Sequence, residues 1–147
     1  MKVVLQRSKY SNVEIDNKIY NEINSGIVAF SCFTEGDTLE DIDYIVKKIV
    51  NLRIFDDENG VMNKSIIDVG GNILSISQFT LYADTKKGNR PSYIRALKGE
   101  ESIKLYDLFN EKLNKIVPTV TGIFGADMKV NIENDGPITI IIDSKNK

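Results

Sequence analysis

The side chains with the clearest chemical potential stand next to one another: Ser77, Gln78, Phe79 and Thr80. They lie near the end of a run, 72–81, that begins with the alternation of a β-strand, and a Gly- and Lys-rich stretch, 85–91, follows it. A strand end that presents polar groups beside a loop is a frequent place for a site, because the strand fixes what the loop presents. A structural interpretation is also open, since Ser and Thr are ordinary on the solvent face of a sheet.

The residues that the chain lacks restrict the chemistry further. It contains no histidine and no tryptophan, and its one cysteine is Cys32. Without histidine there is no Ser-His or Cys-His nucleophile pair, so Thr80 has no partner to activate it as a nucleophile. One cysteine and no histidine also disfavour a zinc site. An enzyme with this composition would rely on hydroxyls, carboxylates, lysines, main-chain groups or the substrate itself, and we expect neither a cofactor nor a metal.

Length and composition favour one globular domain spanning residues 1–147, with 41% apolar and 27% charged residues. No apolar run approaches the roughly 20 residues of a membrane span, and the N-terminal sequence does not resemble a signal peptide. A single cysteine makes the cytoplasm the expected compartment. The net charge of −2 argues against a general nucleic-acid binder, and DNA is not an expected partner. A local basic patch is compatible with this net charge.

Hydrophobic periodicity predicts two long helices. The first follows a cap at Asp37 or Thr38 and places apolar residues on one face as far as Leu52. The second spans 100–117 and ends before a proline, and a short helix over 91–97 is also expected.

Alternating or continuous apolar runs predict the strands. These are 2–8, a hairpin from 13–16 to 19–20, a buried strand 26–33 that includes Cys32 as a core residue, a hairpin from 66–69 to 72–81 across Gly70-Gly71, and strands over 119–127, 128–133 and 138–143. The order of strands, helix, hairpin, helix and strands indicates an α+β fold with a mainly antiparallel sheet and helices on one side.

Two of the motifs resemble those of the D-aminoacyl-tRNA deacylase family. One is Ser77-Gln78-Phe79-Thr80-Leu81, and the other is Asn134-Asp135-Gly136-Pro137-Ile138-Thr139, which matches the family's Gly-Pro motif. Shorter matches occur in the family's order along nearly the whole chain: Gln6-Arg7, Arg53-Ile54-Phe55, Met62-Asn63, Gly88 with Arg90-Pro91-Ser92, and Gly122 with Phe124-Gly125-Ala126-Asp127-Met128. One five-residue motif would be weak evidence, whereas this ordered set is strong.

The resemblance implies a barrel-like, mainly antiparallel sheet with two long helices packed outside it, in a homodimer. It also implies hydrolysis of the ester between a D-amino acid, or glycine, and the 3′-terminal adenosine of tRNA, while L-aminoacyl-tRNA is spared. The segment Ser77–Thr80 would be catalytic: main-chain N–H groups around Phe79 and Thr80 would stabilise the oxyanion, and Thr80 would position groups. The 2′-hydroxyl of the adenosine would assist the attack of water.

The second motif would select the amino acid. In the family the Gly-Pro peptide bond is cis and projects into the pocket of the other subunit, which implies this role for Gly136 and Pro137, with Arg7 bracing their loop. From the sequence alone, 134–137 would be a turn and Arg7 an exposed strand residue.

The acceptor end of tRNA would meet a basic cluster near the first motif: Lys86, Lys87, Arg90 and Arg95, with Lys98 close in sequence. Phe79 is a candidate to stack on the terminal adenine, or alternatively a core residue. Tyr82 stands where a small residue is frequent in the family, so it is a candidate to narrow the pocket mouth. Two competing hypotheses are a non-catalytic RNA- or nucleotide-binding dimer and a deacylase for another misacylated tRNA.

Overall fold

The long strand β1 (Lys2–Ile15) lies at the centre of the sheet, because three other strands pair with it. In the computed structural model, which describes residues Met1–Lys147, the first half of β1 pairs with β3 (Gly26–Cys32) and the second half with β2 (Lys18–Ile23). Strand β8 (Lys129–Asp143) runs along the opposite edge of β1. All three pairings are antiparallel.

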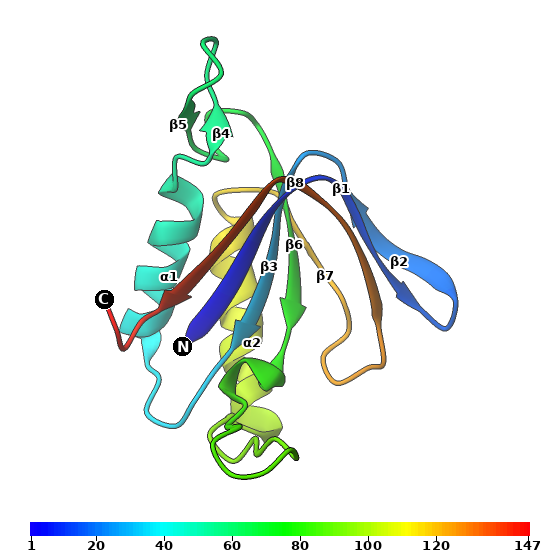
Figure 1. Cartoon of the computed structure of the whole chain (residues 1–147), viewed down its shortest axis with the longest axis vertical. Helices are drawn as coiled ribbons and strands as arrows, with labels where there is room; N and C mark the ends of the chain where they lie inside the picture. Colours follow the sequence, from blue (N-terminus) through cyan, green and yellow to red (C-terminus); the bar gives the residue numbers. More distant parts are fainter.

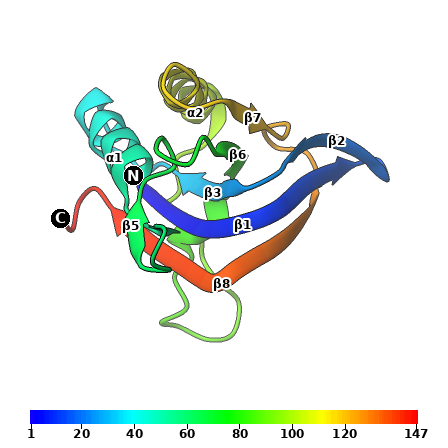
Figure 2. The ribbon, with the colours of Figure 1, turned by 90° about the horizontal axis from the view of Figure 1, so that it is seen from above.

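Two further strands extend the sheet beyond β3. Strand β6 (Asn72–Ser77) lies beside β3, and the short strand β7 (Thr119–Thr121) lies beside β6, both in parallel pairings. The order is β2-β1-β3-β6-β7, with β8 on β1, and the sheet curls into a barrel-like shape (Figure 2). A separate hairpin of β4 (Phe55–Asp56) and β5 (Met62–Lys64) projects at one end (Figure 1).

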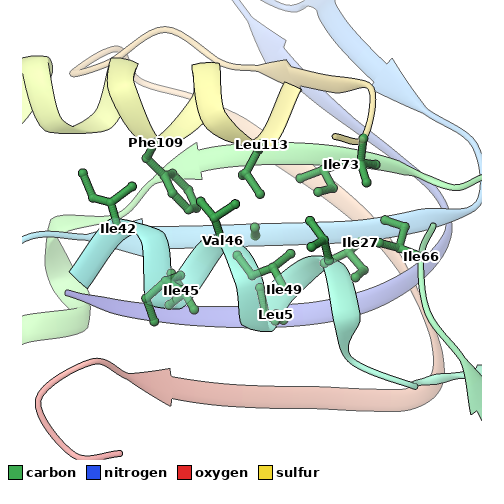
Figure 3. Packing of buried hydrophobic residues seen from close by; sticks show 14 of the residues in the cluster. Leu5, Ile27, Ile42, Ile45, Val46, Ile49, Ile66, Ile73, Phe109 and Leu113 are labelled. Carbon is green, nitrogen blue, oxygen red and sulfur yellow. The ribbon is translucent and has the colours of Figure 1, made fainter. Parts of the chain in front are cut away.

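Helices α1 (Leu39–Asn51) and α2 (Gly99–Asn114) cover one face of the sheet (Figure 2). Their apolar stripes pack on strand residues in the main core (Figure 3), whose fully buried members include Leu5, Ile27, Ile42, Ile45, Ile49, Ile73, Phe109 and Leu113. The α+β class, the mainly antiparallel sheet and the position of both helices are therefore confirmed. Neither helix has the length and apolar character needed to cross a bilayer.

The hairpin expected across Gly70-Gly71 is wrong. Residues 66–70 form turns, and β6 pairs in parallel with β3 and β7 instead of with a preceding strand. The glycines in this region serve a close approach of backbones: a Cβ on Gly26 would lie 1.8 Å from the Asn72 carbonyl oxygen, and one on Gly71 would lie 2.9 Å from the Ile66 side chain. A short Gly-Gly pair resembles a hairpin signal, but here it stands at the end of the crossover from β3 through α1, where Gly71 lets β6 start close to β3.

Three other expectations are corrected. Residues 91–97 form turns and isolated bridges, not a helix, and only Thr119–Thr121 of the expected strand 119–127 is regular. The region 134–137 is not a turn between two strands but part of one continuous strand, β8, whose register against β1 shifts there. For β8, pairing with the distant strand β1 overrides the local pattern.

The start of α1 gives a pH-dependent prediction. The Asp41 carboxylate accepts the Thr38 N–H at 2.8 Å and lies 2.8 Å from Lys145 Nζ. Burial raises the pKa of Asp41, but contacts with Lys145, Ser144 and Thr38 outweigh it and hold this pKa well below the usual value.

Because the folded pKa is depressed, the ionised Asp41 stabilises the native state above the unfolded pKa of about 3.9. We expect that contribution to disappear as the pH falls from about 5 towards 2. The free energy of unfolding, measured with urea across this range, should be lower for Asp41→Asn than for the native chain at pH 7, and the two should converge in acid. The exposed carboxylate of Asp43 in the same helix supplies the control, Asp43→Asn; parallel curves for the native chain and Asp41→Asn would contradict the assignment.

Candidate active site

Strand β6 ends at Ser77, earlier than the sequence indicates, and Phe79–Tyr82 forms a single 3₁₀ turn. The last bond to β3 is donated by the Gln78 N–H to the Ser31 carbonyl at 2.8 Å, and the Leu81 N–H then folds back on the Gln78 carbonyl at 3.2 Å. The N–H groups of Phe79 and Thr80 lie between these bonds and open the turn, so the turn itself offers them no acceptor. This arrangement leaves two neighbouring main-chain donors for a ligand.

The side chains of this turn are organised by one internal hydrogen bond. Gln78 Nε2 donates to Thr80 Oγ1 at 2.6 Å, which fixes the Thr80 side chain against the strand end. An amide is not a base, so this contact does not activate the Thr80 hydroxyl as a nucleophile. The geometry suits a residue that holds position.

A cavity of about 580 Å³ opens beside the end of β6. Ser77, Gln78 and Phe79 contribute to its wall, whereas Thr80 does not. The other walls come from the end of β3, the first turns of α2 and the segment after β7: Ser31, Cys32, Phe33, Ile76, Leu97, Lys98, Gly99, Ser102, Tyr106, Phe124, Gly125, Ala126, Asp127, Met128 and Val130. A mostly apolar, concave space with a few polar groups at its edge is typical of a small-molecule subsite.

Sequence reasoning did not assign the residues of α2 and of 124–128 to the site. The stretch 119–127 was read as a strand, yet Gly122 and Gly125 within it signalled a break, and Gly125 adopts a positive φ of 78°. Cys32 is buried, as expected, but also borders the cavity, and its thiol lies 3.6 Å from the Phe79 carbonyl oxygen. Burial raises the pKa of this thiol to about 11, so it is neutral at ordinary pH.

Phe79 and Tyr82 differ in their exposure to solvent, which the sequence did not reveal. Phe79 is 55% exposed and packs edge-on against Tyr93, with the ring centroids 4.9 Å apart, so the core interpretation of Phe79 is wrong. Tyr82 is only 3% exposed and packs in a small cluster with Cys32 and Ala96, away from the cavity wall. Tyr82 therefore does not narrow the pocket mouth.

The second motif lies on another part of the sheet. The Gly136-Pro137 peptide bond is cis, as the family resemblance implied, and both residues are exposed. They lie in the irregular part of β8, beside Arg7 of β1. The pairing of the strands places Arg7 level with Ile27 of β3 and Ile73 of β6, and Ser77 lies further along β6. Neither Gly136 nor Pro137 lines the cavity, so a single chain does not bring the two motifs together.

Arg7 is buried, with 8% exposure, which contradicts its reading as an exposed strand residue. Its guanidinium donates to the Ile54 carbonyl at 2.7 Å and approaches the Asp56 carboxylate at 3.4 Å. Its Nε lies 3.1 Å from the carboxylate of Asp135, the residue directly before Gly136. Arg7 thus ties the Gly-Pro segment to the β4 region.

The basic residues form two groups. Lys86, Lys87 and Arg90 are exposed in a loop that a pair of hydrogen bonds between Asp84 and Ser92 closes, with N–H to carbonyl distances of 2.8 and 2.9 Å. The guanidinium of Arg95 instead stacks on the buried ring of Tyr82, 5.5 Å from its centroid. Both groups follow directly on the 3₁₀ turn in the chain, at the end of the molecule where β6 terminates (Figure 1).

Comparisons with known proteins show which family has this sequence and fold. A family profile described as D-Tyr-tRNA(Tyr) deacylase matches residues 4–143. A Clostridium acetobutylicum protein named D-aminoacyl-tRNA deacylase is 55% identical over 146 residues, covering 99% of this chain and 98% of its own.

Two solved structures share the fold. One, named c-Myc DNA Unwinding Element Binding Protein, has a TM-score of 0.92 and 37% identity, covering 97% of this chain and 98% of its own. The other, described as a probable eukaryotic D-amino acid tRNA deacylase, has a TM-score of 0.81 and 17% identity, covering 96% and 97%.

The fold and site thus define a small α+β protein with a binding cavity at the end of strand β6. More particularly, the chain belongs to the D-Tyr-tRNA(Tyr) deacylase family, a family of hydrolases.

The role of Arg7 in tying down the Gly-Pro segment can be tested by substitution. Arg7→Ala leaves the Ile54 carbonyl unpaired, so we expect a loss of about 1–3 kcal/mol in the free energy of unfolding. Lys9 also reaches Asp135, at 3.6 Å, but is exposed, so Lys9→Ala should cost less than about 1 kcal/mol. Urea titration compares the two, and equal effects would mean that Arg7 does not brace the segment.

Proposed function

We propose that the protein hydrolyses the ester bond of D-aminoacyl-tRNA, and of glycyl-tRNA, releasing the free amino acid and tRNA. The observation that carries this proposal is a relative named D-aminoacyl-tRNA deacylase that is 55% identical over nearly the whole chain. The cavity beside two main-chain donors at the end of β6 supports the same activity. Such an activity would be exercised in the cytoplasm.

The reaction needs little from side chains. Water attacks the ester carbonyl carbon, and the negative charge that develops on the carbonyl oxygen is stabilised by the N–H groups of Phe79 and Thr80. Loss of one such donor typically costs about 100- to 1000-fold in rate. The intermediate collapses by releasing the 3′ oxygen of the terminal adenosine, which takes up a proton, and the neighbouring 2′-hydroxyl assists the proton transfers. Ser77, Gln78 and Thr80 hold the turn in place.

The cavity takes the terminal nucleoside in this proposal. Its apolar lining suits a base, and the exposed ring of Phe79 at its edge offers a stacking surface that does not depend on base identity.

Stereochemical selection is assigned to Gly136 and Pro137 of a second copy of the chain. Their distance along the sheet from the cavity of their own chain supports a homodimer in which each copy completes the other's pocket. Their carbonyl oxygens would fix the amino group of the substrate and leave no room for an L side chain. Glycine has no side chain, so its ester enters as well.

One assay compares three substrates with the purified protein: D-Tyr-tRNA, Gly-tRNA and L-Tyr-tRNA. We expect the first two to be cleaved and the third to survive, because selection acts by excluding an L side chain. Rapid cleavage of L-Tyr-tRNA would refute that mechanism. Binding of tRNA without any turnover would instead favour a non-catalytic nucleic-acid-binding role, in line with the name of the relative at 37% identity.

The basic loop is proposed to hold the phosphates of the acceptor end. Replacing Lys86 and Lys87 together with alanine should weaken tRNA binding and reduce the magnitude of the slope of log K against log salt by roughly 1.4 to 1.8, since each of the two phosphate contacts contributes about 0.7–0.9. The matched control is the exposed pair Lys47 and Lys48 on α1, whose replacement keeps the net charge change equal. Filter binding between about 50 and 200 mM salt measures these slopes. Identical slopes for both double variants would remove the loop from the tRNA footprint.

A further inference from the structure

The edge of β6 that faces away from β3 is only partly covered. Strand β7 pairs with β6 from Ile73 to Ser75 and then ends. The Ile73 N–H bonds to the Pro118 carbonyl on this edge, whereas the Gln78 N–H bonds to β3 on the other. Because successive residues of a strand direct their backbone groups to alternate edges, the groups of Ser77 face the side that β7 leaves open, and the Phe79 N–H follows two residues later at the start of the 3₁₀ turn.

A side chain from α2 takes over where β7 stops. The hydroxyl of Tyr106 donates to the Ser75 carbonyl at 2.9 Å in a buried environment. Burial raises the pKa of this hydroxyl, and its hydrogen bond to Ser75, together with the nearby Asn110 side chain and Ser77 backbone, partly offsets that rise. The ring packs against Phe124 with the centroids 5.6 Å apart and lines the cavity, so its position is fixed on both sides.

We propose that Tyr106 is a positioning residue whose hydroxyl replaces the missing strand on the open edge of β6 and thereby aims the Phe79 N–H at the substrate's carbonyl oxygen. This inference rests on the proposed function. Tyr106 touches none of the reacting atoms. It holds the main-chain segment that leads to the Phe79 N–H, which is the donor to the substrate's carbonyl oxygen. Donors must lie about 2.7–3.1 Å from the developing oxyanion, and a misplacement of about 1 Å can lower a rate about 100-fold.

The test removes one oxygen atom and retains the ring. In Tyr106→Phe, we expect kcat for D-Tyr-tRNA to fall at least about 10-fold with KM nearly unchanged, because the donor is misaligned while the cavity keeps its shape. The matched control is Tyr82→Phe in the 3₁₀ turn, which also removes a buried tyrosine hydroxyl, but one without a hydrogen-bond partner. That variant should keep the parent kcat. Circular dichroism sets an assay temperature at which all three proteins are folded.

A readout without substrate separates this inference from the proposed function. Amide hydrogen exchange followed by NMR should be faster at Ser77 in Tyr106→Phe than in the parent and in Tyr82→Phe. Unchanged exchange at Ser77, a kcat equal to that of Tyr82→Phe, or a rise in KM alone would each overturn the positioning role. If the parent itself cleaves none of the esters, the proposed deacylation fails, and the exchange rates still decide whether Tyr106 holds the strand edge.

Discussion

The unequal lengths of β6 and β7 are the constraint on which the rest of the site depends. Strand β6 has 6 residues and its outer neighbour β7 has 3, so the carboxyl end of β6 has β3 on one side and no strand on the other. An uncovered strand end exposes backbone donors and acceptors that need partners. The cavity forms at that edge, the 3₁₀ turn leaves the Phe79 and Thr80 N–H groups without acceptors, and the start of α2 closes the space from the side.

Close contact between β3 and β6 makes this arrangement possible. Gly26 and Gly71 allow the backbones to approach where a Cβ would collide, and the resulting parallel register brings Ser31 beside Ser77. The helices then cover one face of this pair with a continuous apolar layer. A rigid sheet thus supports a site made largely of main-chain groups, which suits a chain without histidine.

Separation of the two motifs has a physical consequence for selectivity. The Gly136-Pro137 segment lies at a different level of the sheet from the cavity, and Arg7 anchors it to the β4 region through a buried guanidinium. In the proposed dimer, the groups that act on the ester and those that inspect the amino acid come from different chains. Chemistry that relies on main-chain donors does not by itself distinguish D from L substrates, so a separate selecting surface is needed.

Local pattern was sufficient for some elements and insufficient for others. The two long helices and the β1–β2 hairpin were predicted because amphipathic spacing and turn residues are local properties. The pairing partner of β6 and the continuity of β8 were missed, since parallel pairing and register shifts depend on strands far away in the sequence. The break at Gly122–Gly125 was missed although its glycines are a local signal. The alternating pattern placed Ser77–Thr80 near a strand end but extended the strand through the turn.

By itself, the sequence determined the α+β class, the family and the exclusion of histidine-dependent chemistry, because these follow from composition, periodicity and ordered motifs. Tertiary structure alone decided that Phe79 is exposed, that Tyr82 and Arg7 are buried, and that Tyr106 meets the edge of β6. Exposure and hydrogen-bond partners are set by which distant elements pack together, and residue type constrains them only weakly. That is why the motif could be read from the chain, while the cavity and the support behind it could not.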